Sequence, residues 1–180
     1  MSGPINKPDY QPLAHILPAL EPTKFNSFQH LKNSVMQQRL KQKLWAHITV
    51  NNPGLILELE RDDQLSDYLE SKIESVLPLL DQLTSEGKAD YIIEELCIHT
   101  IVAEMRPYRF NYLWNVLEQE FSAFFKSWEQ DGILTFELIN LQHYCKDTFD
   151  ALGFSMDDAY EDQIYNAITG MIDEYLRQQD

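Results

Sequence analysis

The chain has 180 residues and a formal net charge of −15, because 29 Asp and Glu outnumber 14 Lys and Arg. This excess of acid argues against a general affinity for nucleic acid or for an anionic membrane surface. No apolar run approaches the roughly 20 residues of a membrane span, and the polar start with its prolines does not resemble an export signal, so we expect a cytoplasmic protein.

An extended arm is predicted for residues 1–23, because five prolines interrupt every stretch long enough for a helix. Its apolar side chains are too numerous for a purely solvated tail; they are Tyr10, Leu13, Ile16, Leu17 and Leu20. We therefore expect the arm to pack along its own domain or along a partner. Residues 24–180 are predicted to form a single helical domain, since one core is the default at this length.

A first helix is predicted from about Ser27 to Val50, where the Asn-Asn-Pro-Gly sequence that follows is a strong stop signal. Its apolar residues occupy two faces. One face carries Phe28, Leu31 and Val35, and the other carries Met36, Leu40, Leu44 and Ile48. We expect either a break near Asn33 or contacts with neighbours on two sides of the helix.

Two further helices are predicted before residue 106. The second begins near Asp63, is kinked or ended by Pro78, and is closed by Gly87. Its apolar stripe consists of Leu65, Leu69, Ile73, Val76 and Leu77. The third, from about Lys88 to Met105, has a broad stripe and is expected to be central; the stripe consists of Ile92, Ile93, Leu96, Cys97 and Ile101.

The second half of the chain gives the clearest helical pattern. A fourth helix spans five turns of apolar residues at spacings of three and four, namely Phe110, Leu113, Trp114, Leu117, Phe121, Phe124, Phe125 and Trp128. A fifth is expected to be capped by Thr135 and to end at Gly153, and a sixth to begin near Ser155. The sequence thus predicts an all-α protein, a compact bundle of about six helices with a proline-rich N-terminal arm.

Charge is distributed unevenly along the chain. Residues 1–57 carry 6 basic and 2 acidic side chains, a net +4, whereas residues 58–180 carry 8 basic and 27 acidic ones, a net −19. Lys32, Arg39 and Lys43 lie on one stripe of the first helix and are candidates for contact with an anion or with nucleic acid. The simpler interpretation is that a basic helix packs beside acidic ones, and nucleic acid is not the partner that we expect.

Arg106 and Arg109 form a second candidate anion site, because two arginines flank the start of the fourth helix. Arginines in such a position more often pair with acids of the same chain. Glu95 and His99 are one helical turn apart, but without further ligands they predict an exposed pair and not a metal site. Cys97 and Cys145 are expected to be inert buried thiols.

No catalytic or cofactor motif is present. The chain has no glycine-rich phosphate loop, no nucleophile turn of the Gly-x-Ser-x-Gly type and no calcium loop. We therefore expect a protein that is not an enzyme and that holds no cofactor or metal.

From about residue 40 to the C-terminus, four segments carry a resemblance to a known family. They are Asn52-Pro53-Gly54-Leu55, the block from Leu113 to Phe121, the block from Tyr144 to Phe149, and the tail from Ile168 to Leu176. In these segments the chain resembles an all-helical domain family of unknown function from Bacteroidetes. The resemblance implies a helical fold, a bacterial origin and an association with mobile elements, and it assigns no activity, ligand or functional residue.

The leading hypothesis is a non-enzymatic helical module that binds another protein, which is either a second copy of the chain or a different partner. It rests on the apolar arm and on the two apolar faces of the first helix. The first alternative is a DNA-associated accessory protein of a mobile element, which would use Lys32, Arg39 and Lys43. The second alternative is an enzyme without a recognisable motif.

Overall fold

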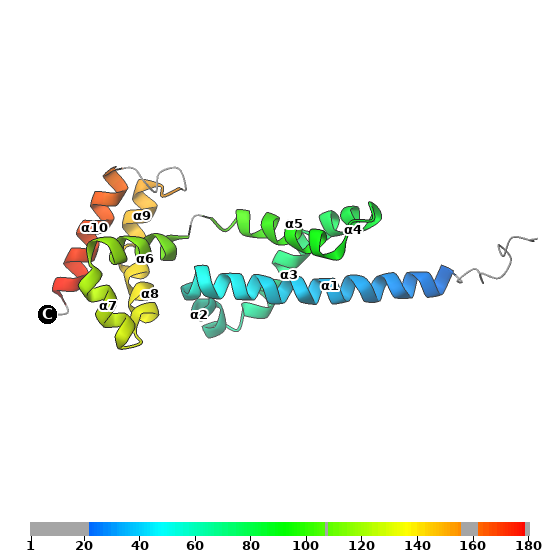
Figure 1. Ribbon diagram of the computed structural model, residues 1–180, viewed down its shortest axis with the longest axis horizontal. Helices are drawn as coiled ribbons and strands as arrows, with labels where there is room; N and C mark the ends of the chain where they lie inside the picture. The colour runs from blue at the N-terminus through cyan, green and yellow to red at the C-terminus, as the bar shows by residue number, and fades with distance from the viewer. Residues whose placement is uncertain (1–21, 107, 156–161, 179–180) are drawn as a thin grey trace, which may run out of the picture. The chain divides into compact units, whose positions relative to one another are not determined.

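The computed structural model describes residues 22–106, 108–155 and 162–178, with side chains described from residue 31 onward. These residues contain helices α1 to α10 and no strand, so the all-α prediction is confirmed (Figure 1). The predicted arm, residues 1–23, lies almost entirely outside the described residues. The chain divides into two units, one ending at Val35 and one beginning at Met36.

Helix α1 (Pro22–Asn51) begins earlier than predicted and continues through Asn33 without a break. Proline is favoured in the first turn of a helix, where its missing N–H has no intrahelical partner, so the last proline of the predicted arm starts the helix. In the unit that ends at Val35, the side chains of Leu31 and Val35 are exposed. Because the helix is continuous, the first of the two expected alternatives, a break near Asn33, is wrong; the second apolar face includes side chains open to solvent.

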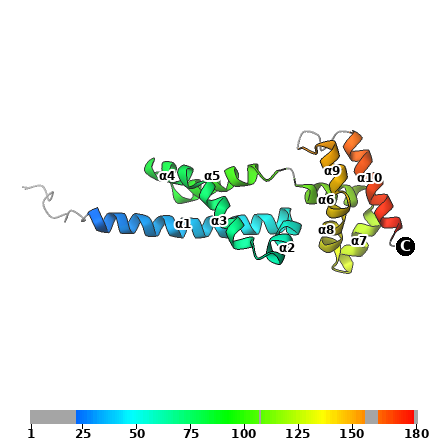
Figure 2. The ribbon, with the colours of Figure 1, turned by 180° about the vertical axis from the view of Figure 1, so that it is seen from behind.

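The segment between α1 and residue 106 contains four helices where two were predicted. They are α2 (Pro53–Arg61), α3 (Leu65–Ser75), α4 (Leu77–Ser85) and α5 (Asp90–Ala103). The Asn-Pro-Gly sequence that ends α1 also starts α2, because Pro53 takes the first helical position. Pro78 acts in the same way in the first turn of α4, and α4 packs against α3 and α5 (Figure 2).

The described residues from 108 onward contain five helices where three were predicted. They are α6 (Arg109–Glu120), α7 (Ser122–Gln130), α8 (Leu134–Tyr144), α9 (Lys146–Leu152) and α10 (Asp162–Arg177). The predicted fourth helix breaks at Phe121, whose φ of −123° and ψ of 42° are not helical. The predicted cap at Thr135 is wrong because the residue at the N-cap is Ile133, whereas Gly153 does end a helix, with a φ of 64°.

Two hydrophobic clusters hold these helices. The first, the aliphatic cluster, is made from α1 to α5 and contains Met36, Leu40, Leu44, Ile48, Ile56, Leu69, Ile73, Val76, Leu80, Leu83, Ile93, Cys97, Ile101 and Val102. The second, the aromatic cluster, includes Phe110, Phe125, Trp128, Phe149 and Phe154. The rings of Phe149 and Phe154 contact each other, and those of Phe125 and Trp128 contact the partly buried Trp114 and Phe124. Within this cluster α6 packs against α7, α8 and α10.

Of the helices in the described part of the chain, none combines the length and the apolar character that crossing a bilayer requires.

Candidate functional site

The part of α1 from Met36 onward has one buried and one exposed side. Met36, Leu40, Leu44 and Ile48 recur every four residues and are buried in the aliphatic cluster. On the rest of the surface Trp45 is 45% exposed and Val50 is 70% exposed, although both are large apolar side chains. One row of side chains on this helix therefore makes its contacts with the core, and the rest of the helix exposes some apolar surface to solvent.

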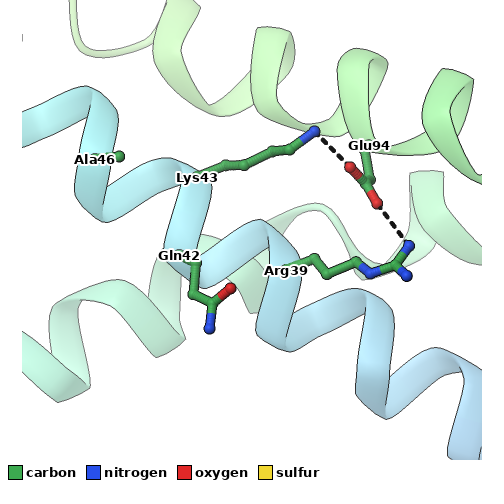
Figure 3. A pocket seen from close by; sticks show the side chains of 5 residues that line it. All are labelled: Arg39, Gln42, Lys43, Ala46 and Glu94. Atoms are coloured by element: carbon green, nitrogen blue, oxygen red, sulfur yellow. Dashed lines mark hydrogen bonds and ion pairs between the residues drawn. The ribbon is translucent and has the colours of Figure 1, made fainter.

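A hollow of about 420 Å³ lies beside this exposed side. It is lined by Arg39, Gln42, Lys43 and Ala46 from α1 and by Glu94 from α5. Figure 3 shows Arg39 and Lys43 extending from α1 towards the two oxygens of the Glu94 carboxylate. Gln42 and Ala46 complete the α1 wall of the hollow.

Glu94 is the buried member of this group, with only 7% of its surface exposed. Arg39 Nη1 donates to Glu94 Oε1 at 3.0 Å, and Lys43 Nζ forms an ion pair with Glu94 Oε2. The hydrogen bond from Lys43 is the main reason that the pKa of Glu94 is lowered, with Arg39 adding to the shift and burial opposing it. The carboxylate thus stays ionised because two cations compensate the loss of water.

The carboxylate of Glu94 does not occupy all the hydrogen-bond donors of the two cations. The side chains of Arg39 and Lys43 are 53% and 54% exposed, so about half of each side chain faces solvent. A guanidinium has five N–H donors and an ammonium has three, and the interactions with Glu94 leave donors available on both. The hollow therefore carries two positive charges against one negative charge.

Lys41 on the same helix is a useful contrast. Its Nζ donates to Glu70 Oε1 of α3 at 2.7 Å, which gives one cation to one carboxylate. This pair and the group around Glu94 agree with the simpler interpretation of the sequence, in which a basic helix packs beside acidic ones. In the group around Glu94, by contrast, two cations share one carboxylate.

The five residues named from the sequence as anion contacts are in different surroundings. Arg39 and Lys43 come together in the hollow, and Lys32 is exposed in the unit that ends at Val35. Arg109 pairs with Asp150 at 2.6 Å and its guanidinium lies 5.2 Å from the centre of the Phe149 ring. Arg106 is exposed. The pKa of His47 is lowered mainly by the burial of His47 and also by the positive charge of Arg106.

The sequence did not identify Glu94 as a site residue. The exposed pair predicted from the sequence was Glu95 and His99, and the structure exposes both but buries Glu94, the residue before Glu95. A signal was present, because Glu94 lies three residues before Cys97 and so falls on the apolar stripe of α5. An acid on such a stripe needs a compensating cation.

A second, smaller hollow of about 180 Å³ lies between α2 and α8. Its lining residues are Gly54, Glu58, Arg109, Ile139, Gln142, His143 and Lys146. Arg109 and Lys146 face two acids there, because both pair with Asp150 and because Glu58, 3.5 Å from His143, also lines the hollow. With Glu58 and Asp150 close by, this hollow has less positive excess to offer an anion than the hollow beside Glu94.

Metal and thiol chemistry find no support in the part of the chain that the structure describes. There, no group of three or more His, Cys, Asp or Glu side chains is placed to hold a metal ion. Both cysteines are free and buried, as expected. Burial raises the pKa of Cys97 and raises that of Cys145 to about 12, so both thiols stay protonated and are weak nucleophiles at neutral pH.

Comparisons of the chain with protein-family models, with curated proteins and with solved structures found no match.

Proposed function

We propose that this chain is a non-enzymatic module that binds another protein through the exposed side of α1 between Met36 and Asn51. The observation that carries the proposal is the exposure of Trp45 and Val50 on a helix whose opposite side is fully packed. Tryptophan is enriched among the residues that dominate binding energy at protein interfaces. Trp45 would supply an apolar anchor, and the half-exposed Arg39 and Lys43 lie at the other edge of the exposed side.

The alternative of a DNA-associated accessory protein depends on free cations along α1. Arg39 and Lys43 share the carboxylate of Glu94, and Lys41 is paired with Glu70. A polyanion would therefore compete with two acids and would also meet a chain with a net charge of −15. For this reason protein binding ranks ahead of DNA binding.

Photo-crosslinking from position 45 tests the proposal. The crosslinking residue p-benzoylphenylalanine replaces Trp45 in one chain and Ser127, an exposed residue of α7, in a matched control. Irradiation in the native cells should give a discrete adduct from position 45 that is absent from position 127. A dimer of the chain would also count as an adduct, because a second copy is a protein partner.

The opposite result would be clear. If positions 45 and 127 give the same faint and diffuse pattern, in cells and with the purified chain, the exposed side of α1 is not a protein-binding surface and the proposal fails.

A further inference from the structure

We infer that the hollow beside Glu94 binds a carboxylate from an acidic and apolar segment of the partner protein. The inference rests on the proposed protein-binding function and specifies the chemistry of the partner. The carboxylate would bind Arg39 and Lys43, and an apolar side chain of the same segment would lie on the surface of Ala46 and Val50.

Charge supports a carboxylate as the group that is recognised. Arg39 and Lys43 together face one internal acid, so a second carboxylate brings the group to two cations and two anions. Guanidinium and ammonium groups form their strongest hydrogen bonds with anionic oxygens. The single acid of the group, Glu94, extends from α5 between the two cations, and Arg39 and Lys43 each keep about half of their side chain exposed to an incoming group.

The helix places an apolar surface in register with the cations. Lys43 and Val50 are seven residues apart, which is about two helical turns, so they lie on nearly the same line along α1. Ala46 lies between them, one turn before Val50, whereas Trp45 lies on the far edge of the exposed side, well away from this line. The distance along the axis from Lys43 to Val50 is roughly 10 Å, which three residues of an extended peptide can span.

A short acidic segment fits this surface better than nucleic acid does. The excess at the hollow is a single positive charge, and nucleic acid would bring several phosphates towards a chain of net charge −15. A peptide that brings one or two carboxylates close to the hollow needs only that local excess. Its apolar side chains would bury surface that Val50 now exposes.

The probe for the test is a fluorescent, end-blocked octapeptide of alternating leucine and glutamate. The same peptide with glutamine in place of glutamate is the control, and a short duplex DNA is a third probe. Fluorescence anisotropy with the full chain should show saturable binding of the glutamate peptide below about 1 mM and weaker binding of the glutamine peptide.

Variants of the chain assign the binding to the hollow. Arg39→Gln and Lys43→Gln should each weaken binding of the glutamate peptide about fivefold, and Lys43→Arg should restore it. Lys41→Gln removes the same charge from the same helix outside the hollow and should leave the affinity nearly unchanged. Glu94→Gln should tighten binding, because it removes the internal carboxylate that competes for both cations.

Each contrary outcome overturns the inference. These outcomes are no saturable binding of the glutamate peptide, equal losses for Lys41→Gln and Lys43→Gln, or weaker binding in Glu94→Gln while that variant melts like the parent chain. Tighter binding of the duplex DNA than of the peptide would assign the hollow to phosphates. A dimer that dissociates in Lys43→Gln, without peptide binding, would assign it to a second copy.

The outcome for the proposed function is separate. An adduct from position 45 that persists in Arg39→Gln and Lys43→Gln chains would keep protein binding and remove the carboxylate site. If the chain with the crosslinker at position 45 and no other change gives no adduct, both protein binding through this side of α1 and the carboxylate site are ruled out.

Discussion

The two hydrophobic clusters of the unit from Met36 to Asp180 are built from different side chains. The aromatic cluster of α6 to α10 buries phenylalanine and tryptophan rings that contact one another, whereas the fully buried members of the aliphatic cluster include no aromatic residue. The aliphatic cluster is instead bordered by a buried acid, Glu94, held by two cations. One cluster is thus stabilised mainly by packed area, and the other also depends on electrostatic compensation.

This difference matters for function because the helices around the two clusters expose different surfaces. Aromatic rings fill the inner side of α6 to α10 with contacts made within the chain. The cations that compensate Glu94 must approach it from the side of α1 and keep about half of their surface in solvent. The aliphatic half therefore presents a charged and apolar surface that a partner can use.

The largest expected effect is in the aromatic cluster. Phe149 has no exposed surface and contacts the rings of Tyr112 and Phe154, so Phe149→Ala should lower the free energy of unfolding by about 3 to 5 kcal/mol. Chemical denaturation measures it. Phe136→Ala removes an exposed ring and should change the same quantity by less than about 0.5 kcal/mol. Equal losses in the two variants would contradict the assignment of the cluster.

The next largest effect on the free energy of unfolding is expected beside the aliphatic cluster. Replacing Arg39 and Lys43 together by methionine leaves the Glu94 carboxylate buried without its cations, which should cost about 2 kcal/mol or more. The pKa of Glu94 should then rise above its usual value, since burial acts unopposed. Lys41→Met, whose partner Glu70 is exposed, should cost less than about 1 kcal/mol in the same denaturation experiment.

Each cluster contains one buried cysteine, so the stabilities of the aliphatic and the aromatic cluster can be compared in the same molecule. Cys97 belongs to the aliphatic cluster and Cys145 to the aromatic one. Native-state thiol labelling followed by mass spectrometry should modify Cys97 about tenfold faster, because the smaller side chains around it make opening less costly. Labelling at equal rates would show that both clusters open in one event.

The smallest effect is the dependence on pH. The pKa of Glu94 is lowered from 4.5 in the folded chain, so its contribution to stability is complete above that value and is lost as the pH falls through the lowered pKa. The parent chain should therefore lose more stability than Glu94→Gln between about pH 5 and pH 3. Melting curves of both chains at a series of pH values measure the difference. If the two chains lose the same stability as the pH falls, Glu94 does not have this role.

The fold class and much of the core could be predicted from the sequence because the apolar spacing is regular. The row from Phe110 to Trp128 does pack on the aromatic cluster, with Leu113 and Leu117 fully buried. The break at Phe121 could not be predicted, since neither glycine nor proline marks it and its ring still contacts the core. Helix α2 was missed because the sequence that ends one helix also begins the next.

The candidate site could be predicted only in part. The stripe of cations on α1 follows directly from the spacing of Arg39 and Lys43. Their partner does not, because a single sequence does not show which of 29 acids faces a given helix. The exposure of Trp45 was also not predicted, since it depends on which side of α1 the aliphatic cluster covers.

The emission of Trp45 tests the central claim most directly. The difference in fluorescence between the parent chain and Trp45→Phe isolates this indole from Trp114 and Trp128, which contact the aromatic cluster. In the free chain it should emit as a solvent-exposed tryptophan, and the partner protein that crosslinks to position 45 should shift it to shorter wavelength and protect it from acrylamide quenching. An emission that is already protected in the free chain, or that does not change while that partner binds, would contradict the claim that the exposed side of α1 is the binding surface.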